Sequence, residues 1–515
     1  MAGNQSELFE EDLETLHAFA NAARRNLDAF KTFLDRGTSH AVQCLDFGEH
    51  SAAVQLLCGG LWRGGKILVR TEYREALQAL EEEQVYRKGA YVVGQPGIGK
   101  TYFLIYLLVE RLREHKAVAF QLSSCPFYVL FTENVTVHSI QHSKPLRHSD
   151  VWGLSDSNSL IMTPAPAFLD LPNVRVVQAT SPNRNRWKEW SKQYGAGRYV
   201  MKVWSIDEIE DLAVLLGLDV ERMTACAKEW GGVPRTLLSF TTSDEGDFEC
   251  EIQKAASNAV IACDDFIRAI ESLAVDKSVP SSIFFIKPME DNDGHVYRRR
   301  PVTYVPTPRI ADELAVALRN KDKAIKIAFF RSMESHPTTR QSGGFIYENW
   351  FHSLFASGEV VECQWYITAG SVSLPDTLQT PTGMAPLTLD GLKFTMPPFY
   401  WVPPTSNFPG INSVLVTENE IFAIQITLSY DHTSPQVGLD HLRNLVLMDK
   451  KSLPWRVLVV GLEEEHVLSA IRKWAEKLTF GPPRSKTTIP VGWCVVDPTR
   501  RKIAYIGSDR TRYDP

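Results

Sequence analysis

Short apolar runs alternate with amphipathic helical patterns through the first half of the chain. From about residue 86 this alternation becomes regular, which is typical of a mainly parallel sheet covered by helices. Residues 205–240 then show helical periodicity. The apolar runs that predict strands span residues 90–93, 118–122, 127–131, 151–154 and 174–179. This part of the chain is therefore predicted to have an α/β fold.

The second half begins after a polar, acidic stretch at 241–247 that is typical of a domain boundary. A hairpin is predicted at 282–305, between two helical segments, and the remainder mixes helices and strands. The chain has 515 residues, too many for one hydrophobic core. Four regions are predicted: an N-terminal helical or mixed domain at 1–85, an α/β domain with a helical lid at 86–240, a helical and hairpin connector at 241–335, and a second α/β domain at 336–515.

Composition and charge limit the classes of function that the chain could have. The formal net charge is −6, so the whole chain lacks the basic footprint typical of nucleic-acid-binding proteins. Its eight cysteines are scattered without a CxxC pair, which argues against a zinc site and fits a reducing compartment. The sequence contains neither a conventional signal peptide nor an apolar run long enough to span a membrane. We expect an intracellular protein of the cytoplasm or nucleus.

The segment GQPGIGKT follows a predicted strand and opens a predicted helix, which is the setting that a phosphate-binding P-loop requires. Gly94, Gly97 and Gly99 would let the backbone wrap around phosphate groups. Lys100 would approach the β- and γ-phosphates, and the Thr101 hydroxyl would ligate Mg²⁺. The predicted cofactors are therefore ATP, or another nucleoside triphosphate, and Mg²⁺.

A second Mg²⁺ carboxylate is expected at the end of a neighbouring strand. Asp156 ends the run VWGLSD and is assigned to the metal site together with Thr101. Ser157 follows it in place of the usual catalytic Glu, so nucleotide binding is a safer prediction than hydrolysis. Extra strands before Asp156 resemble the additional-strand class of P-loop ATPases, which includes AAA-like and STAND-like proteins.

Basic residues beyond the next predicted strand are candidates for contact with the nucleotide. Arg184 and Arg186 could act as an arginine finger, and Lys188 follows them. The turn GGVPR resembles the second sensor of AAA-like and STAND-like ATPases, with Arg235 available to reach the nucleotide. A solvated, basic helix start explains the first three residues equally well.

An ordered set of segments resembles the Crinkler–RHS family of eukaryotic effectors and mobile-element-associated proteins. The resemblance covers most of residues 86–450. Its segments are GQPGIGKT, WGLSDS, VQATSPNRNRWKEWSKQ, YVMKVWSIDEIEDL, GGVPR, SIFFIKP, GGFIYENWFHSLF, FYWVPPTSNFPGINSVL and IFAIQITLSYDHTSPQVGLDHL. It implies a P-loop NTPase followed by a restriction-endonuclease-like domain, in an effector directed at DNA. The N-terminal translocation header of many Crinklers is not recognisable, so delivery to a host cell stays open.

The resemblance also implies a set of nuclease-site positions. Glu348 falls on the helical metal-binding acid, Asn412 on the hairpin Asp, and Gln425 and Thr427 on the (Asp/Glu)-x-Lys positions. Nucleases of this kind need several carboxylates to hold Mg²⁺ and a Lys to orient water. The set here keeps only one carboxylate, so weak Mg²⁺ binding is expected.

Other residues could complete this site or contact a nucleic acid. Asp431, His432 and Asp440 lie downstream and could supply a ligand or a base, although His432 could equally cap a helix. Basic runs could follow a phosphate backbone, but short charge runs are usually solvated surface. These runs are Arg298, Arg299 and Arg300, and Arg500, Arg501, Lys502, Arg510 and Arg512.

Two functions therefore stay open. In the first, an ATP-binding NTPase domain regulates a nuclease-like, DNA-directed C-terminal domain in an effector or toxin. In the second, the chain is a STAND-like signalling switch whose inactive nuclease fold binds protein or nucleic acid. DNA, host or self proteins, and further copies of the chain are candidate partners.

Overall fold

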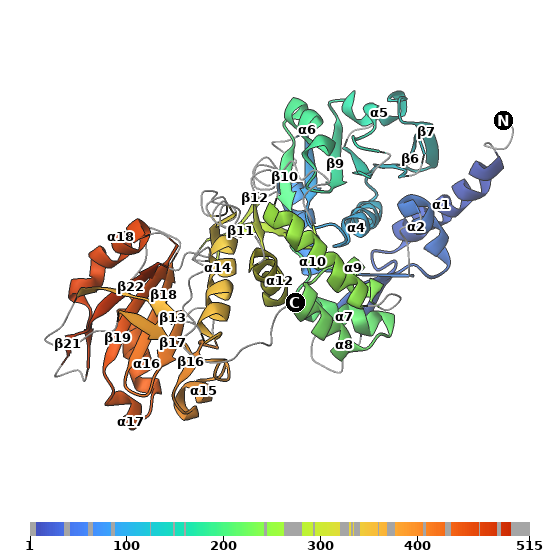
Figure 1. Cartoon of the computed structure of the whole chain (residues 1–515). Helices are drawn as coiled ribbons and strands as arrows, with labels where there is room; N and C mark the ends of the chain where they lie inside the picture. The colour runs from blue at the N-terminus through green and yellow to red at the C-terminus, as the bar shows by residue number, and fades with distance from the viewer. Residues whose placement is uncertain are drawn as a thin grey trace. The chain divides into compact units, whose positions relative to one another are not determined.

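The computed structural model divides the chain into two compact units (Figure 1). The first unit comprises Met1–Ala255 and Asp265–Ile310, and the second comprises Ala256–Asp264 and Ala311–Pro515. Both contain sheets and helices, so the chain is a multidomain α/β protein, as the hydrophobic pattern predicted. The structure describes residues 7–34, 42–59, 65–83, 88–123, 125–147, 150–158, 161–240, 245–261, 281–291, 294–319, 329–330, 333, 340–358, 360–367, 376–404, 408–427, 434–462, 464–481 and 486–495.

A seven-stranded sheet with the order β10-β4-β9-β8-β5-β6-β7 forms the centre of the first unit. The strands from β10 to β5 are parallel, and β6 and β7 add an antiparallel edge. The β9 strand therefore separates β4 from β8. The strands are β4 (Gly89–Val93), β5 (Val118–Gln121), β6 (Phe127–Phe131), β7 (Val135–Ser139), β8 (Val151–Asp156), β9 (Val174–Thr180) and β10 (Gly197–Val200).

Helices cover this sheet through large apolar side chains. The helix α4 (Lys100–Arg113) is buried on almost every side and packs against β5, β8 and β9. A helix that is apolar all round is one that the core surrounds. Another hydrophobic cluster joins Phe168 of α5 (Pro166–Leu169) and Trp190 of α6 (Lys188–Tyr194) with Tyr91 of β4.

The N-terminal segments pack onto the same unit. They form a three-stranded antiparallel sheet, β1-β2-β3, in the region predicted as a helical or mixed domain. The helices α1, α2 and α3 all contact α4. These elements are α1 (Glu7–Arg25), β1 (Lys31–Leu34), β2 (Val42–Asp46), α2 (Ser51–Cys58), β3 (Lys66–Leu68) and α3 (Thr71–Glu83).

Helices and one hairpin follow β10 in the chain. The helix α7 begins at a capping box, in which Ser205 and Glu208 satisfy each other's backbone N–H groups. The helices are α7 (Ile206–Leu216), α8 (Val220–Trp230), α9 (Pro234–Ser239), α10 (Glu245–Ile261) and α12 (Pro308–Arg319). The predicted hairpin is confirmed as β11 (Phe285–Glu290) paired with β12 (Val296–Tyr304).

The second unit is built on a six-stranded sheet with the order β14-β22-β19-β18-β17-β16. Within it, β18, β19 and β22 are parallel to one another. Small two-stranded sheets pair β13 with β15 and β20 with β21. The elements are α14 (Arg340–Phe355), β13 (Val360–Glu362), β14 (Gln364–Ile367), β15 (Thr377–Gln379), α15 (Leu389–Phe394), β16 (Phe399–Trp401), β17 (Ser413–Val416), β18 (Ile421–Thr427), α16 (Gln436–Leu445), α17 (Met448–Lys451), β19 (Trp455–Gly461), α18 (Glu464–Trp474), β20 (Thr479–Phe480), β21 (Thr487–Thr488) and β22 (Val491–Val495).

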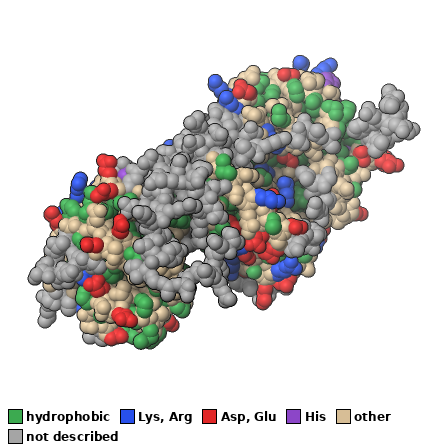
Figure 2. Space-filling model, in the orientation of Figure 1, with side chains coloured by type: hydrophobic (Ala, Val, Ile, Leu, Met, Phe, Trp, Pro, Cys, Tyr) green, Lys and Arg blue, Asp and Glu red, His purple; other side chains and the backbone are tan. Residues whose placement is uncertain are grey.

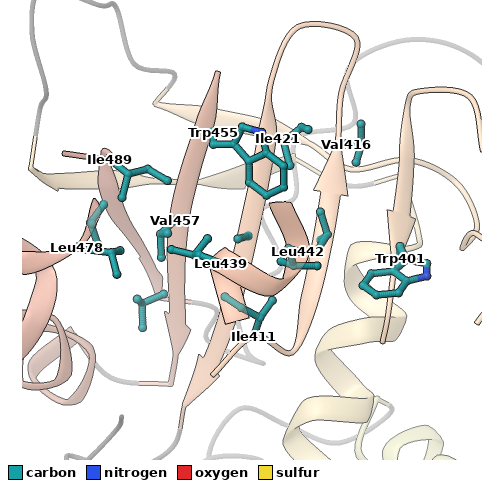
Figure 3. Close-up of a cluster of buried hydrophobic side chains, with 14 of the residues drawn as sticks. Trp401, Ile411, Val416, Ile421, Leu439, Leu442, Trp455, Val457, Leu478 and Ile489 are labelled. Carbon is teal, nitrogen blue, oxygen red and sulfur yellow. The ribbon is translucent and has the colours of Figure 1, made fainter. Parts of the chain in front are cut away.

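One face of this sheet carries a large apolar core. Leu439 and Leu442 of α16 lie beside Ile421 and Val457 of the central strands, as Figure 3 shows. All four side chains are fully buried. Phe399 and Trp401 of β16 belong to this core, so Tyr400 between them faces the other side of the sheet. Because Tyr400 contacts Phe355 of α14, the core and α14 cover opposite faces.

Candidate functional site

The loop between β4 and α4 has the backbone geometry that its glycines predicted. Gly97 and Gly99 have φ angles of 87° and 92°, a region that side chains other than glycine rarely adopt. A Cβ atom on Gly99 would lie 2.6 Å from the Tyr73 Oη, and one on Gly97 would lie 2.7 Å from the Arg235 Cβ. Both positions therefore require glycine for conformation and for space.

The predicted metal-site residues are in direct contact. Thr101, in the first turn of α4, donates a 2.6 Å hydrogen bond from its hydroxyl to the Asp156 carboxylate. Asp156 is the last residue of β8, and parallel strands present such carboxyl ends at one edge of the sheet. A hydroxyl and a carboxylate are oxygen groups of the kind that Mg²⁺ prefers.

Lys100 is folded back onto the loop. Its Nζ donates hydrogen bonds of 2.9 Å to the carbonyl oxygens of Gly94 and Gln95. Burial lowers the pKa of Lys100 to about 7, although the Asp156 carboxylate opposes this effect; Arg235 and Arg186 lower the pKa further. Burial also raises the pKa of Asp156, against the opposing effects of Thr101 and the three cations. The site is thus a partly exposed cluster with more positive than negative groups, which suits a polyanion.

The two arginines reach the site from different elements. The backbone N–H of Arg235, in α9, donates a 3.4 Å hydrogen bond to the Gly97 carbonyl. The Arg186 guanidinium donates a 3.2 Å hydrogen bond to the Ser157 carbonyl. Arg184 lies in the same short 3-10 helix as Arg186, and Lys188 forms an ion pair with Glu189.

Ser157 occupies the position after Asp156 where a catalytic acid would be expected. Its hydroxyl donates a 2.8 Å hydrogen bond to the Thr180 hydroxyl at the end of β9. A neutral hydroxyl that is already engaged is a poor base for an attacking water. Ser157 is therefore a poor candidate for activating an attacking water.

Two further residues touch the loop and were not predicted from the sequence. The Tyr73 hydroxyl donates to the Gly99 carbonyl at 2.8 Å, and the Trp204 indole N–H donates to the Ile98 carbonyl at 2.9 Å. Both residues lie far from the motif in the sequence. Their sequence context is typical of ordinary apolar core positions. No signal in one sequence distinguishes them.

In the second unit, the structure brings two of the predicted nuclease-site residues together. The Asn412 side-chain amide donates a 2.9 Å hydrogen bond to the Glu348 carboxylate. The Asn412 side-chain oxygen accepts a 2.8 Å hydrogen bond from the Ile426 backbone N–H. Asn412 therefore uses its amide to join α14 to β18.

Gln425 and Thr427 lie on β18 with almost fully buried side chains. Strand alternation places both on the face that carries Ala423 and the apolar core. Consistently, a Cβ built on Gly461 would meet the Thr427 side chain. The Glu348 helix packs on the opposite face.

A chain of polar side chains extends from Glu348 to β17 on the sheet face that α14 covers. The His352 imidazole lies 3.4 Å from the Glu348 carboxylate and 2.7 Å from the Tyr400 hydroxyl, which donates to the Ser413 hydroxyl at 2.7 Å. Burial raises the pKa of Tyr400 well above its usual value. Sequence analysis singled out neither His352 nor Ser413.

Among the residues that the structure describes, Asp440 is the remaining candidate of the second unit, and it belongs to no ligand cluster. Asp440 forms an ion pair with Lys486 at 2.9 Å. In the part of the chain that the structure describes, no three His, Cys, Asp or Glu side chains are grouped so that they could hold a metal ion. Asp431, His432 and the basic run at 500–512 lie outside the described residues.

The described surface carries charges of both signs. On the face drawn in Figure 2, basic and acidic side chains are interspersed. Arg298, from the predicted basic run, forms an ion pair with Glu72 at 2.8 Å. None of the described helices is long and apolar enough to cross a membrane.

Comparison with known proteins gives a distant relationship. No protein-family model matches the chain. The chain is 27% identical over 309 residues to Crinkler effector protein 15 of Phytophthora infestans, and 27% identical over 312 residues to Crinkler effector protein 16. Each alignment covers 57% of this chain and 46% of the relative, so the chain spans about half the length of the curated relatives it matches. These partial similarities support a Crinkler-like relationship.

Proposed function

We propose that the first unit binds a nucleoside triphosphate, with ATP as the expected ligand, together with Mg²⁺. The observation that carries this proposal is the 2.6 Å hydrogen bond between Thr101 and Asp156, which joins the start of α4 to the end of β8. In P-loop proteins, this hydroxyl and this carboxylate hold Mg²⁺ against the β- and γ-phosphates. Lys100, Arg186 and Arg235 supply the positive charge that the phosphates require.

The order of the strands supports the same proposal. The β9 strand lies between the loop strand β4 and the acid-bearing strand β8. Such an inserted strand is the feature that defines the additional-strand class of P-loop ATPases, to which AAA-like and STAND-like proteins belong. A nucleotide bound at the carboxyl ends of these strands also follows the general rule for open α/β sheets.

The nucleotide is proposed to act as a regulator rather than as a fuel for fast turnover. Ser157 replaces the catalytic acid and is bonded to Thr180. Slow hydrolysis would leave the protein in one nucleotide state long enough to control a second module. The effector names of the two relatives suggest that this control serves an effector role.

The second unit is proposed to be the DNA-directed output module, acting by binding rather than by cleavage. Glu348 carries the one carboxylate among the four predicted nuclease-site positions. The Asn412 side chain is hydrogen-bonded to both Glu348 and Ile426. Gln425 and Thr427 carry neither the acid nor the lysine of a restriction-endonuclease-like site. The second candidate is a STAND-like switch whose second unit binds protein. Sequence-independent DNA binding at low salt is expected of the DNA-directed module, and its absence would favour the protein-binding switch.

The Mg²⁺ dependence of ATP binding tests the proposed nucleotide site. Asp156→Ala removes the carboxylate, so MgATP affinity should fall at least about tenfold while the affinity for Mg²⁺-free ATP should change much less. Calorimetric titration with Mg²⁺ or with EDTA measures both values. Asp170→Ala, at an exposed acid after α5, is the matched control. Equal losses with and without Mg²⁺ would show that Asp156 is not at the metal.

A further inference from the structure

Two buried aromatic side chains hold consecutive carbonyl groups of the phosphate-binding loop. Tyr73 of α3 is fully buried, and its hydroxyl bonds to the Gly99 oxygen at 2.8 Å. Trp204, which precedes α7, is 7% exposed, and its indole N–H bonds to the Ile98 oxygen at 2.9 Å. Neither residue belongs to the loop motif, and they come from segments on opposite sides of it in the sequence.

A single arginine holds both aromatic rings in place. The Arg70 guanidinium lies 4.7 Å from the Trp204 ring centre and 5.8 Å from the Tyr73 ring centre. It also donates hydrogen bonds of 3.0 and 2.9 Å to the two carboxylate oxygens of Glu208 and one of 3.1 Å to the Val203 carbonyl. With its guanidinium fixed at several points, Arg70 restricts the movement of both rings.

The peptide geometry gives these contacts a consequence for phosphate binding. In a planar trans peptide, the C=O and the following N–H point in opposite directions. Fixing the Ile98 carbonyl therefore fixes the Gly99 N–H, and fixing the Gly99 carbonyl fixes the Lys100 N–H. The Gly99 carbonyl also accepts the Phe103 N–H at 3.0 Å, the first helical hydrogen bond of α4. Both aromatic donors thus hold two consecutive loop N–H groups so that they point away from the Tyr73 and Trp204 side chains.

We propose that Tyr73 and Trp204 are positioning residues that hold the Ile98–Gly99 and Gly99–Lys100 peptide planes in their phosphate-binding orientation, with Arg70 as the common support. This inference rests on the proposed nucleotide-binding function. It adds to that function a preorganisation of the loop by elements outside the motif. Preorganised donors lose less entropy on binding, so the effect should be seen in affinity.

Conservative variants test the assignment. Tyr73→Phe and Trp204→Phe remove one hydrogen-bond donor each and keep an aromatic ring beside Arg70. Each should weaken MgATP and MgADP binding about fivefold, and equally for the two nucleotides, because both carry the β-phosphate that the loop would hold. The double variant should lose less than the product of the two single effects, because the contacts act on adjacent peptide planes.

The control is Tyr106→Phe. Tyr106 packs beside Tyr73 with ring centres 5.8 Å apart, and within the described chain no hydrogen bond joins its hydroxyl to the loop. Thermal melts establish that every variant is folded before titration. Affinities within twofold of wild type for Tyr73→Phe and Trp204→Phe would overturn the inference, as would an equal loss in Tyr106→Phe. Absence of binding by the wild type would instead contradict the proposed function.

Discussion

Burial changes the charge state of Lys100 in the proposed nucleotide site. In the described structure its ammonium group is bonded to two loop carbonyls and is surrounded by Asp156, Arg186 and Arg235. Burial lowers its pKa to about 7, so the group is only partly charged near neutral pH. A bound triphosphate would bring negative charge and favour the protonated amine. Binding is therefore expected to take up a proton.

This linkage predicts a pH dependence. As pH rises from 7 to 8, Lys100 in the free protein becomes mostly neutral, so MgATP affinity should fall about fivefold. Lys100→Arg keeps its charge throughout this range and should bind with nearly constant affinity. Titrations at both pH values measure the difference, and the ionisation of ATP itself is common to both proteins. An identical pH profile in the two proteins would contradict the prediction.

The free energy of unfolding of the nucleotide-free protein should change with pH in the direction opposite to that of the MgATP affinity. The pKa of Lys100 is lower in the folded chain than its ordinary value of 10.5. Between about 7 and 10.5 the unfolded chain therefore binds more protons than the folded chain. The contribution of Lys100 to the free energy of unfolding consequently rises with pH over this range.

Residue spacing could predict only part of this site. Gly97, Gly99, Lys100 and Thr101 follow one another in a motif whose strand and helix context is local, so the sequence sufficed to predict their place between β4 and α4. The loop donors Tyr73 and Trp204 lie 26 and 106 residues from the carbonyls that they bind. Such contacts depend on how distant elements pack, which one sequence does not encode as a recognisable pattern.

At the scale of elements, the start of α7 links the N-terminal segments to the nucleotide loop. Glu208 completes the capping box with Ser205 and also pairs with Arg70, whose side chain is almost fully buried. The indole of Trp204, immediately before the cap, contacts the loop. The N-terminus of α7 thus fixes both the start of this helix and the Arg70 side chain beside Trp204.

Glu208→Ala should therefore be strongly destabilising. It leaves Arg70 buried without its carboxylate partner, a change that typically costs about 3–5 kcal/mol of unfolding free energy. Denaturant unfolding monitored by circular dichroism measures the loss. Asp207→Ala, at an exposed acid in the same first turn, should cost less than about 1 kcal/mol. Similar losses in both variants would show that the Arg70 pair contributes little.

Element prediction succeeded at the buried central strands of the first sheet and failed at several edge strands. The strands β4, β8 and β9 are almost entirely buried, and their continuous apolar runs predicted them. In contrast, β7, β10 and β1 lie at the edges of their sheets, carry partly exposed side chains and were missed. Their pairing partners, rather than their own patterns, make them strands.

At the scale of the whole molecule, two units of different chemistry share one chain. The first brings together a complete set of candidate phosphate and Mg²⁺ contacts, whereas the second retains one carboxylate of a nuclease-like set. The resemblance of segment order implied both modules, and the curated relatives support the Crinkler-like relationship. Which chemistry survives in the second module depends on side chains that the segment order does not determine.

The second unit should not cleave DNA. Supercoiled plasmid should stay intact with Mg²⁺ or Mn²⁺, with and without ATP, because Asn412, Gln425 and Thr427 replace the charged groups that hold metal and orient water. Gel electrophoresis measures the conversion to nicked or linear forms, and Glu348→Ala is the matched control. Cleavage by the wild type that disappears in Glu348→Ala would reveal an active nuclease with a neutral-amide metal site.

Calorimetric titration with MgATP measures directly whether the loop at 94–101 binds a nucleoside triphosphate. The wild type should bind saturably at one site per chain. Lys100→Ala should show no binding at the same concentrations while remaining folded, because the loop is a local structure and the lysine donates hydrogen bonds to its carbonyls. Unchanged affinity in Lys100→Ala, or no binding by the wild type, would contradict the account.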